Sequence, residues 1–464
     1  MAHEKAGVLV SGRGRSLLAL VAVAAVAGGG SYLQDLGPRE NAPLPEASVI
    51  SGVWFCPHGG GKGWKVDLLI ANPGPREARV RVRTFGEGRP TEPRRESVAP
   101  GSQTRIEVPA PSRAAGSVVE YFGGWVAAGW VARAGGKETG VAAEPCAPRA
   151  GSWWLAPDGT TLDGERAYLV VLNPFDADAV VDVTLFAEDR PEPVLPEELT
   201  DVVIPAQRAE AFFLNPVVFG ERTLAASVTA SSGRVTVASL GVSETGGARS
   251  ALGSLGPPPE VTLLPGGGDA GQSSLVVVNP LDAKVTFGAR LFGTNRLEGG
   301  GVQGQGLATL SCRTYPVVTS GDAAIEVRAT GGGLGVARRA TGLRNDDGAT
   351  GGAAPAPAWV VLQAVGDSPA TPRLFLANPG TEDSRVRLTL LGGEGGELTV
   401  GVPGGRTLAV KRGFLELAPR AAVVAVASEG TFVAVSASSS GGRLGLSGYA
   451  VAVGVPIPAG HLPG

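Results

Sequence analysis

The sequence predicts an all-β protein: four tandem immunoglobulin-like β-sandwich repeats that follow an N-terminal apolar helix. Three observations lead to this fold class. A strand that ends in Asn-Pro occurs four times at a regular interval, and other turn and strand signals keep the same phase. Beyond the N-terminus no long stretch has a helical period, and glycine falls mainly between valine-rich strands, as expected of turns.

The Asn-Pro motif marks the repeats. In its first copy an apolar strand ends at Asn72-Pro73, and an alternating strand at 78–83 follows. Proline has no amide hydrogen for a sheet ladder, and the asparagine amide bonds the following backbone, so the motif ends a strand and starts a turn. Its other copies, at intervals of 101, 106 and 99 residues, are Asn173-Pro174, Asn279-Pro280 and Asn378-Pro379. Such intervals match an immunoglobulin-sized sandwich of about 100 residues.

Later landmarks in each copy agree with this division. A turn and a short strand follow, and then come two Ala/Val-rich strands around a small-residue turn, which we predict to be hairpins. The hairpins are expected at 117–133, 224–240, 323–338 and 421–436. We name the predicted sandwiches repeat one (50–148), repeat two (151–256), repeat three (260–342) and repeat four (358–456), with linkers at 34–49 and 345–357.

The N-terminus has the pattern of an export signal. Residues 1–16 form a basic region that we expect in the cytoplasm, and residues 17–33 are an uncharged apolar segment. This segment is either a cleaved signal peptide, with cleavage after Ala27, or a short membrane anchor. Both alternatives place the bulk of the chain outside the cell membrane, either on a single-pass anchor or as a secreted protein.

Two cysteines bracket repeat one. Because disulfides persist in exported proteins, we expect Cys56 and Cys146 to be bonded, with two buried free thiols as the alternative. Closing this loop stabilises the fold by about 4–5 kcal/mol on the chain-entropy model. The remaining cysteine, Cys312, lies on an apolar strand and is expected to be a buried structural thiol.

Charge is unevenly distributed. Arg79, Arg81 and Arg83 alternate along one strand and so share a face, which is either an anion-binding surface for lipid headgroups or acidic wall polymer, or an ordinary solvated face. The net charge of −3 does not indicate a nucleic-acid partner. Pairing of the arginines with acidic residues of repeat two, within or between molecules, is a further hypothesis. That acidic set is Asp176, Asp178, Asp182, Glu188, Asp189, Glu192, Glu197, Glu198 and Asp201.

Catalytic and metal-binding patterns are weak. Apart from His3 and His461 near the ends, His58 is the sole histidine, so a Ser-His-Asp triad depends on it and multi-histidine metal sites are excluded. Residues 58–61 superficially match the oxyanion loop of lipases, but the chain has no Gly-x-Ser-x-Gly elbow. We therefore expect no cofactor, no metal and no enzymatic activity, and a hydrolase that uses His58 is the enzymatic alternative.

Repeat one is rich in tryptophan. Trp64, Trp125 and Trp130 are candidates for a platform that stacks on sugar rings, and packing in the core or between domains is the alternative. A solvent-exposed, coplanar pair among the three would favour glycan binding.

The four Asn-Pro pairs with their flanking strands, together with the exported segment, give the chain a family resemblance. It resembles an uncharacterised actinobacterial family of membrane-anchored or secreted proteins that is described as a domain of unknown function. The resemblance implies location and build, and it brings no catalytic residues.

These observations predict a non-catalytic structural or interaction protein of the cell envelope. Its partner is expected to be a cell-envelope protein or a cell-wall glycan, and its N-terminal segment contacts the membrane. One alternative is a protein that binds glycan or an anionic cell-wall polymer, and another is the hydrolase, which requires His58 in a cleft with a hydrogen-bonded Ser, Asp or Glu.

Overall fold

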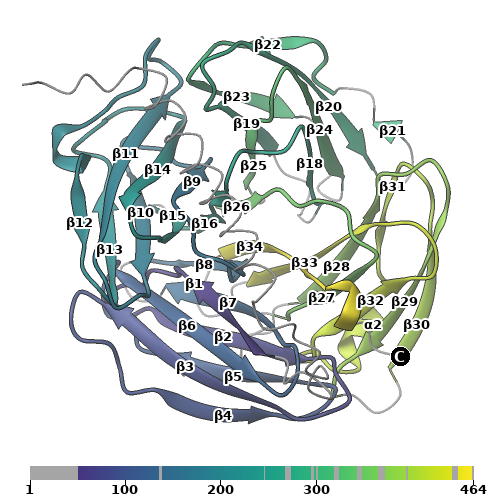
Figure 1. The fold of residues 1–464 in the computed structure, drawn as a ribbon. Helices are drawn as coiled ribbons and strands as arrows, with labels where there is room; N and C mark the ends of the chain where they lie inside the picture. Colours follow the sequence, from purple (N-terminus) through teal and green to yellow (C-terminus); the bar gives the residue numbers. More distant parts are fainter. Residues whose placement is uncertain are drawn as a thin grey trace, which may run out of the picture. The chain divides into compact units, whose positions relative to one another are not determined.

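A computed structural model describes most of the chain after residue 50 as β-strands (Figure 1). The described residues are 51–134, 138–244, 246–266, 273–293, 297–298, 301–317, 323–341, 347–363, 371–392, 396–440 and 448–461. Besides strands they include the helix α2 (Arg412–Glu416) and the 3-10 turns η1 (Glu197–Leu199) and η2 (Ala459–His461). The predicted segments 1–16, 17–33 and 34–49 lie outside them. No helix within the described part is long and apolar enough to cross a membrane.

The strands follow the predicted repeats closely. Those of repeat one are β1 Ser51–Cys56, β2 Lys65–Asn72, β3 Ala78–Gly86, β4 Arg94–Val98, β5 Ser102–Val108, β6 Ala115–Phe122, β7 Ala127–Ala134 and β8 Gly140–Pro145. Those of repeat two are β9 Trp153–Ala156, β10 Glu165–Asn173, β11 Ala179–Ala187, β12 Val202–Ile204, β13 Arg208–Phe213, β14 Leu224–Ser232, β15 Thr236–Ser243, β16 Ala248–Leu252 and β17 Ser254–Leu255.

The second half of the chain has the same succession. The strands of repeat three are β18 Val261–Leu264, β19 Ser273–Asn279, β20 Val285–Phe292, β21 Leu297–Glu298, β22 Gln305–Leu307, β23 Ser311–Val317, β24 Ala324–Thr330, β25 Gly335–Thr341 and β26 Asp347–Gly351. Those of repeat four are β27 Ala358–Val361, β28 Thr371–Asn378, β29 Ser384–Leu390, β30 Glu397–Val402, β31 Arg406–Ala409, β32 Val423–Ala427, β33 Val433–Ser440, β34 Gly448–Val453 and β35 Val455–Pro456. The expected linker 345–357 is therefore partly wrong, because β26 lies in it and pairs with β25.

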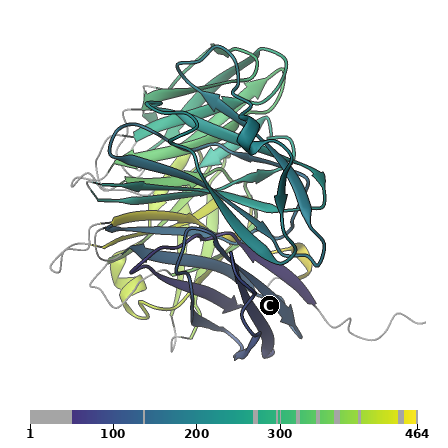
Figure 2. The same cartoon turned by 90° about the vertical axis from the view of Figure 1, so that its left-hand side faces the viewer.

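Each repeat forms two antiparallel sheets that enclose a shared apolar core. In repeat one the sheet orders are β1-β6-β3-β4 and β5-β2-β7-β8. The corresponding strands of the other repeats pair in the same way, for example β9 with β14 and β10 with β15. Repeat two, coloured teal, faces the viewer in Figure 2. The all-β prediction is confirmed.

The strand order differs from that of an immunoglobulin domain. There the first, second, fifth and fourth strands share a sheet, whereas here β1 pairs with β6 and β2 pairs with β7. The predicted hairpins are wrong for the same reason, because β6 and β7 lie in different sheets and the small residues between them let the chain cross the sandwich. The strands themselves lie where the alternation placed them.

The Asn-Pro motif is a crossing of the same kind. Asn72 ends β2, and its side-chain amide donates hydrogen bonds to the carbonyls of Arg76 (2.7 Å) and Val98 (3.0 Å), the last residue of β4 in the opposite sheet. Its Oδ1 accepts the amide of Gly74 (3.0 Å), as the predicted Asx turn requires. Asn173, Asn279 and Asn378 make the equivalent contacts. The buried asparagine thus joins the two sheets of each repeat.

The repeats of the compact unit Ile50–Gly464 also contact one another. The closing strands of the four sandwiches touch in cyclic order: β8 with β16, β16 with β26, β26 with β34, and β34 with β8 (Figure 1). Polar bonds reinforce these contacts, for example between Gly247 N–H and the Thr139 carbonyl (2.8 Å) and between Arg339 and Asp158 (2.6 Å). The four sandwiches therefore pack together rather than extending as separate domains.

Candidate functional site

A pocket of about 800 Å³ lies where the carboxyl ends of β8, β16, β26 and β34 meet. Pro145 and Leu252 are the last residues of β8 and β16, Gly352 directly follows β26, and Val453 ends β34. All four repeats therefore contribute to the wall. A pocket of this volume is within the range of small-molecule sites, about 300–1,000 Å³.

The wall is mainly apolar. Its aromatic residues are Trp54, Tyr121, Trp125, Trp359 and His461. Its prolines, which fall near the repeat boundaries, are Pro145, Pro148, Pro157, Pro258, Pro259, Pro456 and Pro458. Proline adds apolar surface without an unpaired amide hydrogen. The indole N–H groups of Trp54 and Trp359 donate to the backbone carbonyls of Val126 (2.8 Å) and Phe432 (2.6 Å), so these rings are satisfied within the protein.

Glu144 is the acidic side chain in this wall. It lies on β8, opposite Trp130 of β7, and is 3% exposed. Its carboxyl group accepts a hydrogen bond from the backbone of Leu252 in repeat two, while Oε1 has no hydrogen-bond partner in the protein. Burial raises the pKa of Glu144 well above its ordinary value, against the opposing effect of the Leu252 bond. The uncharged form of the acid is therefore favoured.

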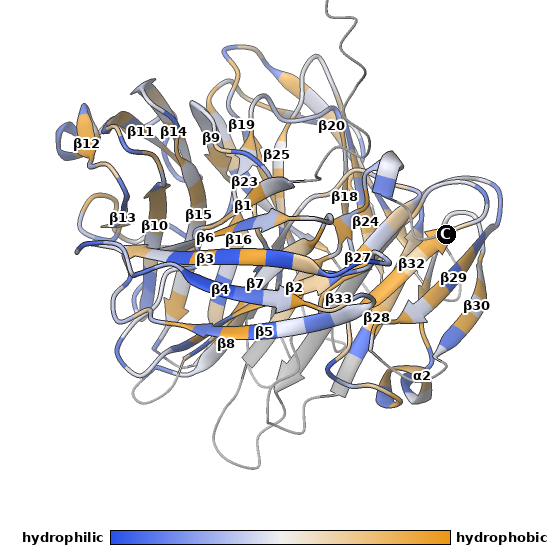
Figure 3. Ribbon diagram, turned by 60° about the horizontal axis from the view of Figure 1, so that its bottom comes forward, coloured by the Kyte–Doolittle hydropathy of each residue, from blue (hydrophilic) through white to orange (hydrophobic). Residues whose placement is uncertain are grey.

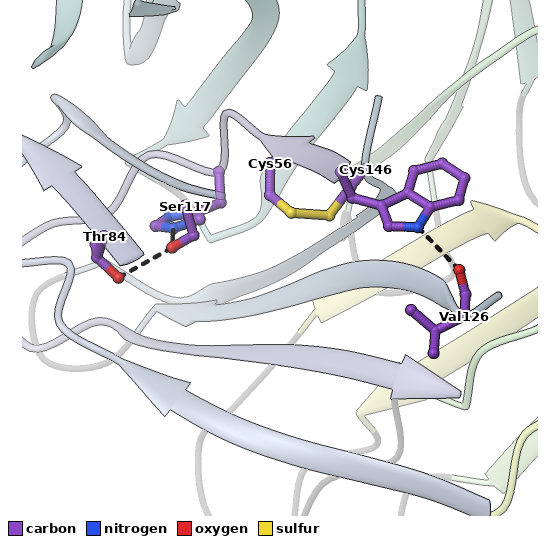
Figure 4. The surroundings of a disulfide bond; sticks show 7 residues. Cys56, Thr84, Ser117, Val126 and Cys146 are labelled. Carbon is purple, nitrogen blue, oxygen red and sulfur yellow. Dashed lines mark hydrogen bonds between the residues drawn. A yellow bond between two sulfur atoms is a disulfide. The ribbon is translucent and has the colours of Figure 1, made fainter. Parts of the chain in front are cut away.

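The predicted disulfide is confirmed, and it lies at the edge of this pocket (Figure 4). Cys56 and Cys146 are bonded with their Cα atoms 4.5 Å apart, and Cys146 is part of the wall. The bond joins the end of β1 to the segment that follows β8. Next to it, Phe55 and Ala147 exchange two backbone hydrogen bonds of 2.9 and 2.7 Å. The disulfide thus fixes the segment that carries Glu144.

His58 is buried in the interior of repeat one, at 1% exposure. Its Nδ1 donates to the Gly59 carbonyl (2.6 Å), which leaves Nε2 to accept from the Ser117 hydroxyl (2.9 Å), and Thr84 donates to Ser117 (3.1 Å; Figure 4). A base and a hydroxyl are therefore in hydrogen-bond contact, but Ser117 is fully buried and no substrate can reach it. The condition of a cleft at His58 is not met.

The buried histidine makes folding dependent on pH. Burial lowers the pKa of His58 to about 4, although its bond to the Gly59 carbonyl acts in the opposite direction. The unfolded chain takes up this proton below its ordinary pKa of 6.5, and the folded chain does so only below about 4. We expect the free energy of unfolding to fall by about 3 kcal/mol between these pH values.

Urea unfolding between pH 7.5 and 4 tests this expectation. The His58→Gln variant should have a shallower dependence on pH than the wild type. The His461→Gln variant, which leaves the buried histidine in place, should keep the wild-type dependence. Equal slopes for the wild type and His58→Gln would contradict a neutral buried histidine.

The three predicted platform tryptophans lie in three different environments. Trp64, at 7% exposure, donates to Glu138 (2.7 Å) and stacks against the Arg113 guanidinium, whereas Trp130, at 1%, packs edge-on against His58. Trp125, at 6%, stacks on His461 beside the pocket. The predicted exposed platform is therefore wrong, because packing within and between sheets covers all three rings.

The arginine face is placed as predicted. Arg79, Arg81 and Arg83 share the outer side of β3, whose alternation of polar and apolar residues is visible in Figure 3. Arg79 is exposed, and Arg81 pairs with Glu120 (2.6 Å). No ion pair joins these arginines to the acidic set of repeat two in the described part of the chain. Asp178 and Asp182 instead accept backbone amides within repeat two. Anion binding by the face stays a prediction.

Cys312 is a free and buried thiol, as expected. It lies between repeats three and two and donates to the carbonyl of Phe186 (3.2 Å). Burial raises its pKa, so the reactive thiolate is disfavoured. Among the described residues no group of three His, Cys, Asp or Glu side chains is arranged to hold a metal ion.

Sequence reasoning missed Glu144 and the pocket. The available signal was the recurrence of proline at the repeat boundaries, which we interpreted only as turns and linkers. Glu144 itself stands directly before Pro145 and Cys146 and has the local pattern of an ordinary strand-end acid.

Comparisons with known proteins agree with the expected lack of a characterised family. No curated protein matches the chain. A family model does match residues 120–301, which run from within β6 through repeat two and into repeat three. Over these residues the chain is similar to DUF5719, a family of unknown function.

Proposed function

We propose that this chain is a non-catalytic binding protein of the cell envelope, built from four copies of one sandwich, which holds a small and mainly apolar molecule in the pocket between them. The observation that carries this proposal is the composition of the wall. Aromatic and proline residues from four separate repeats converge on one space of about 800 Å³. Such walls with few polar groups are typical of ligand sites.

The chemistry of the pocket favours binding over catalysis. The titratable side chains that line it are Glu144, Tyr121 and His461. Burial raises the pKa values of both Glu144 and Tyr121, which favours their uncharged forms. A general acid or base is most effective with a pKa near the working pH, in contact with the reacting group. The wall instead offers apolar contact and one hydrogen-bonding carboxyl group.

A location outside the cytoplasm is part of the proposal. The Cys56–Cys146 disulfide supports it, because such bonds persist in oxidising compartments, and so does the apolar segment 17–33. We propose that this segment holds the chain at the membrane or directs its secretion. An envelope protein or a cell-wall glycan would then be the partner of the outer surfaces, and the arginine face of β3 would serve an anionic one.

The test is to purify the full chain from cell envelopes and to measure binding of the uncharged fluorophore N-phenyl-1-naphthylamine. We expect saturable binding and energy transfer from Trp54 and Trp125, which line the pocket. Ala354 is exposed and lines the pocket, so Ala354→Trp should weaken binding at least about tenfold, which corresponds to about 1.4 kcal/mol.

The matched control is Ala99→Trp, at an exposed alanine that is not part of the wall. It should leave the affinity unchanged. Equal affinities for the two variants, or no saturable binding by the wild type, would overturn the proposal. Native mass spectrometry of the purified chain shows directly whether a bound molecule is apolar or a wall glycan.

A further inference from the structure

Glu144 is anomalous within its surroundings. Its side chain is 3% exposed and lines a pocket whose wall is otherwise mainly apolar, and its Oε1 has no hydrogen-bond partner in the protein. A buried polar atom without a partner costs about 1–3 kcal/mol. A ligand that forms the missing hydrogen bond would recover part of that cost, so Oε1 marks the point at which the pocket can recognise a polar group.

The charge state of this group follows from its contacts. No ion pair to Glu144 is found among the described residues, and the group that does contact its carboxyl is the uncharged backbone amide of Leu252. A carboxyl group that is removed from water without a nearby cation is favoured in its protonated form. In that form it has one O–H donor, while the Leu252 amide already uses an acceptor site.

We infer that the pocket selects an uncharged ligand with a hydrogen-bond acceptor, such as the carbonyl oxygen of a ketone, ester or amide, and that Glu144 donates a hydrogen bond to this oxygen. The inference deepens the proposed function and rests on it. A cationic ligand would require the ionised carboxylate, which this environment disfavours. An anionic ligand would lose its hydration and find no described cation among the residues that line the pocket.

The rest of the ligand is set by the wall. Trp54, Trp125 and Trp359 present aromatic surface, and prolines from all the repeats except the third part of the wall contributed by β26 complete it together with Pro258 and Pro259. Flat or ring-containing apolar molecules make the largest contact with such a surface. We therefore expect an aromatic or alicyclic body with one neutral carbonyl group.

Four naphthalene probes of nearly equal size test this selectivity: naphthalene, 2-acetylnaphthalene, 2-naphthoate and 2-naphthylmethylammonium. Titrations use the full chain at neutral pH, with tryptophan fluorescence as the readout. For the wild type we expect 2-acetylnaphthalene to bind about tenfold more tightly than naphthalene, which is the effect of one well-formed hydrogen bond. Both charged probes should bind more weakly than naphthalene.

Two substitutions separate a neutral donor from a carboxylate. Glu144→Gln keeps an uncharged hydrogen-bond donor and should retain the preference for the ketone within about threefold. Glu144→Met keeps the approximate size but lacks the donor, so the ketone should bind no more tightly than naphthalene. The affinity of Glu144→Met for naphthalene shows whether its pocket is intact.

The possible failures are distinguishable. If the wild type binds none of the four probes, the proposed function fails. If the probes bind but Glu144→Met keeps the full ketone preference, the pocket binds ligands and the inference about Glu144 is wrong. Tightest binding of the ammonium probe, lost in Glu144→Gln, would also overturn it by showing that the carboxyl group is ionised.

Discussion

Replacing Cys56 and Cys146 together by alanine should lower the free energy of unfolding of repeat one by about 4–5 kcal/mol. The two residues are 90 positions apart, so the bond restricts a large part of the unfolded chain. Both side chains are buried, and the bond joins β1 to the segment after β8. The effect should therefore be seen first as weaker protection of β1 and β8 in hydrogen exchange.

Denaturant unfolding of the oxidised, reduced and doubly substituted chains measures this effect. Because several sandwiches unfold in one chain, the earliest transition is the one to compare. Cys312→Ala is the matched control, since it removes a buried sulfur without removing a crosslink. Its loss should be clearly smaller. An early transition that is unchanged by reduction would show that the packing of repeat one does not need the bond.

Replacing Asn173 by alanine should cost about 4 kcal/mol in repeat two. The Asn173 amide donates to the carbonyls of Ala177 (2.9 Å), Ile204 (3.0 Å) and Pro205 (3.2 Å), and its Oδ1 accepts the amide of Phe175 (3.1 Å). The side chain is fully buried. Its loss leaves polar groups of both sheets without their partner in a site that water does not fill easily.

Asn173→Asp makes the test sharper. An aspartate can accept the Phe175 amide, but its second oxygen faces carbonyls that cannot donate. We expect this variant to be at least as unstable as Asn173→Ala at neutral pH and to recover on acidification, when the carboxyl group gains a proton. Asn215→Ala, at a half-buried asparagine with two hydrogen bonds, is the control and should lose less. Equal losses at Asn173 and Asn215 would remove the special role of the Asn-Pro motif.

Sequence reasoning located the strands because their causes are local. Asn72 and Pro73 end β2 by their own chemistry, and the Arg79-to-Arg83 alternation requires an extended strand with one face outward. The disulfide was also accessible, because the two cysteines bracket a single repeat. In each case the necessary information lies within a few residues or within one domain-length segment.

Strand pairing and the pocket depend on distant contacts. A small-residue turn such as Gly123-Gly124 serves a hairpin or a crossing between sheets equally well, and only the packing of β6 on β1 decides between them. Glu144 is unusual because Leu252 of another repeat lies against it. No local pattern shows that four boundary segments converge, and so the site could not be derived from any one of them.

The contact between β34 and β8 has a consequence for how such a chain can change. In a linear array each module contacts only its neighbours, so modules can be added or lost at the ends. Here the first and last sandwiches also contact each other, and a duplicated fifth unit would have to separate them. Copy number is therefore constrained by geometry. The last contact also joins residues far apart in sequence, so we expect folding to finish slowly, after repeat four has been synthesised.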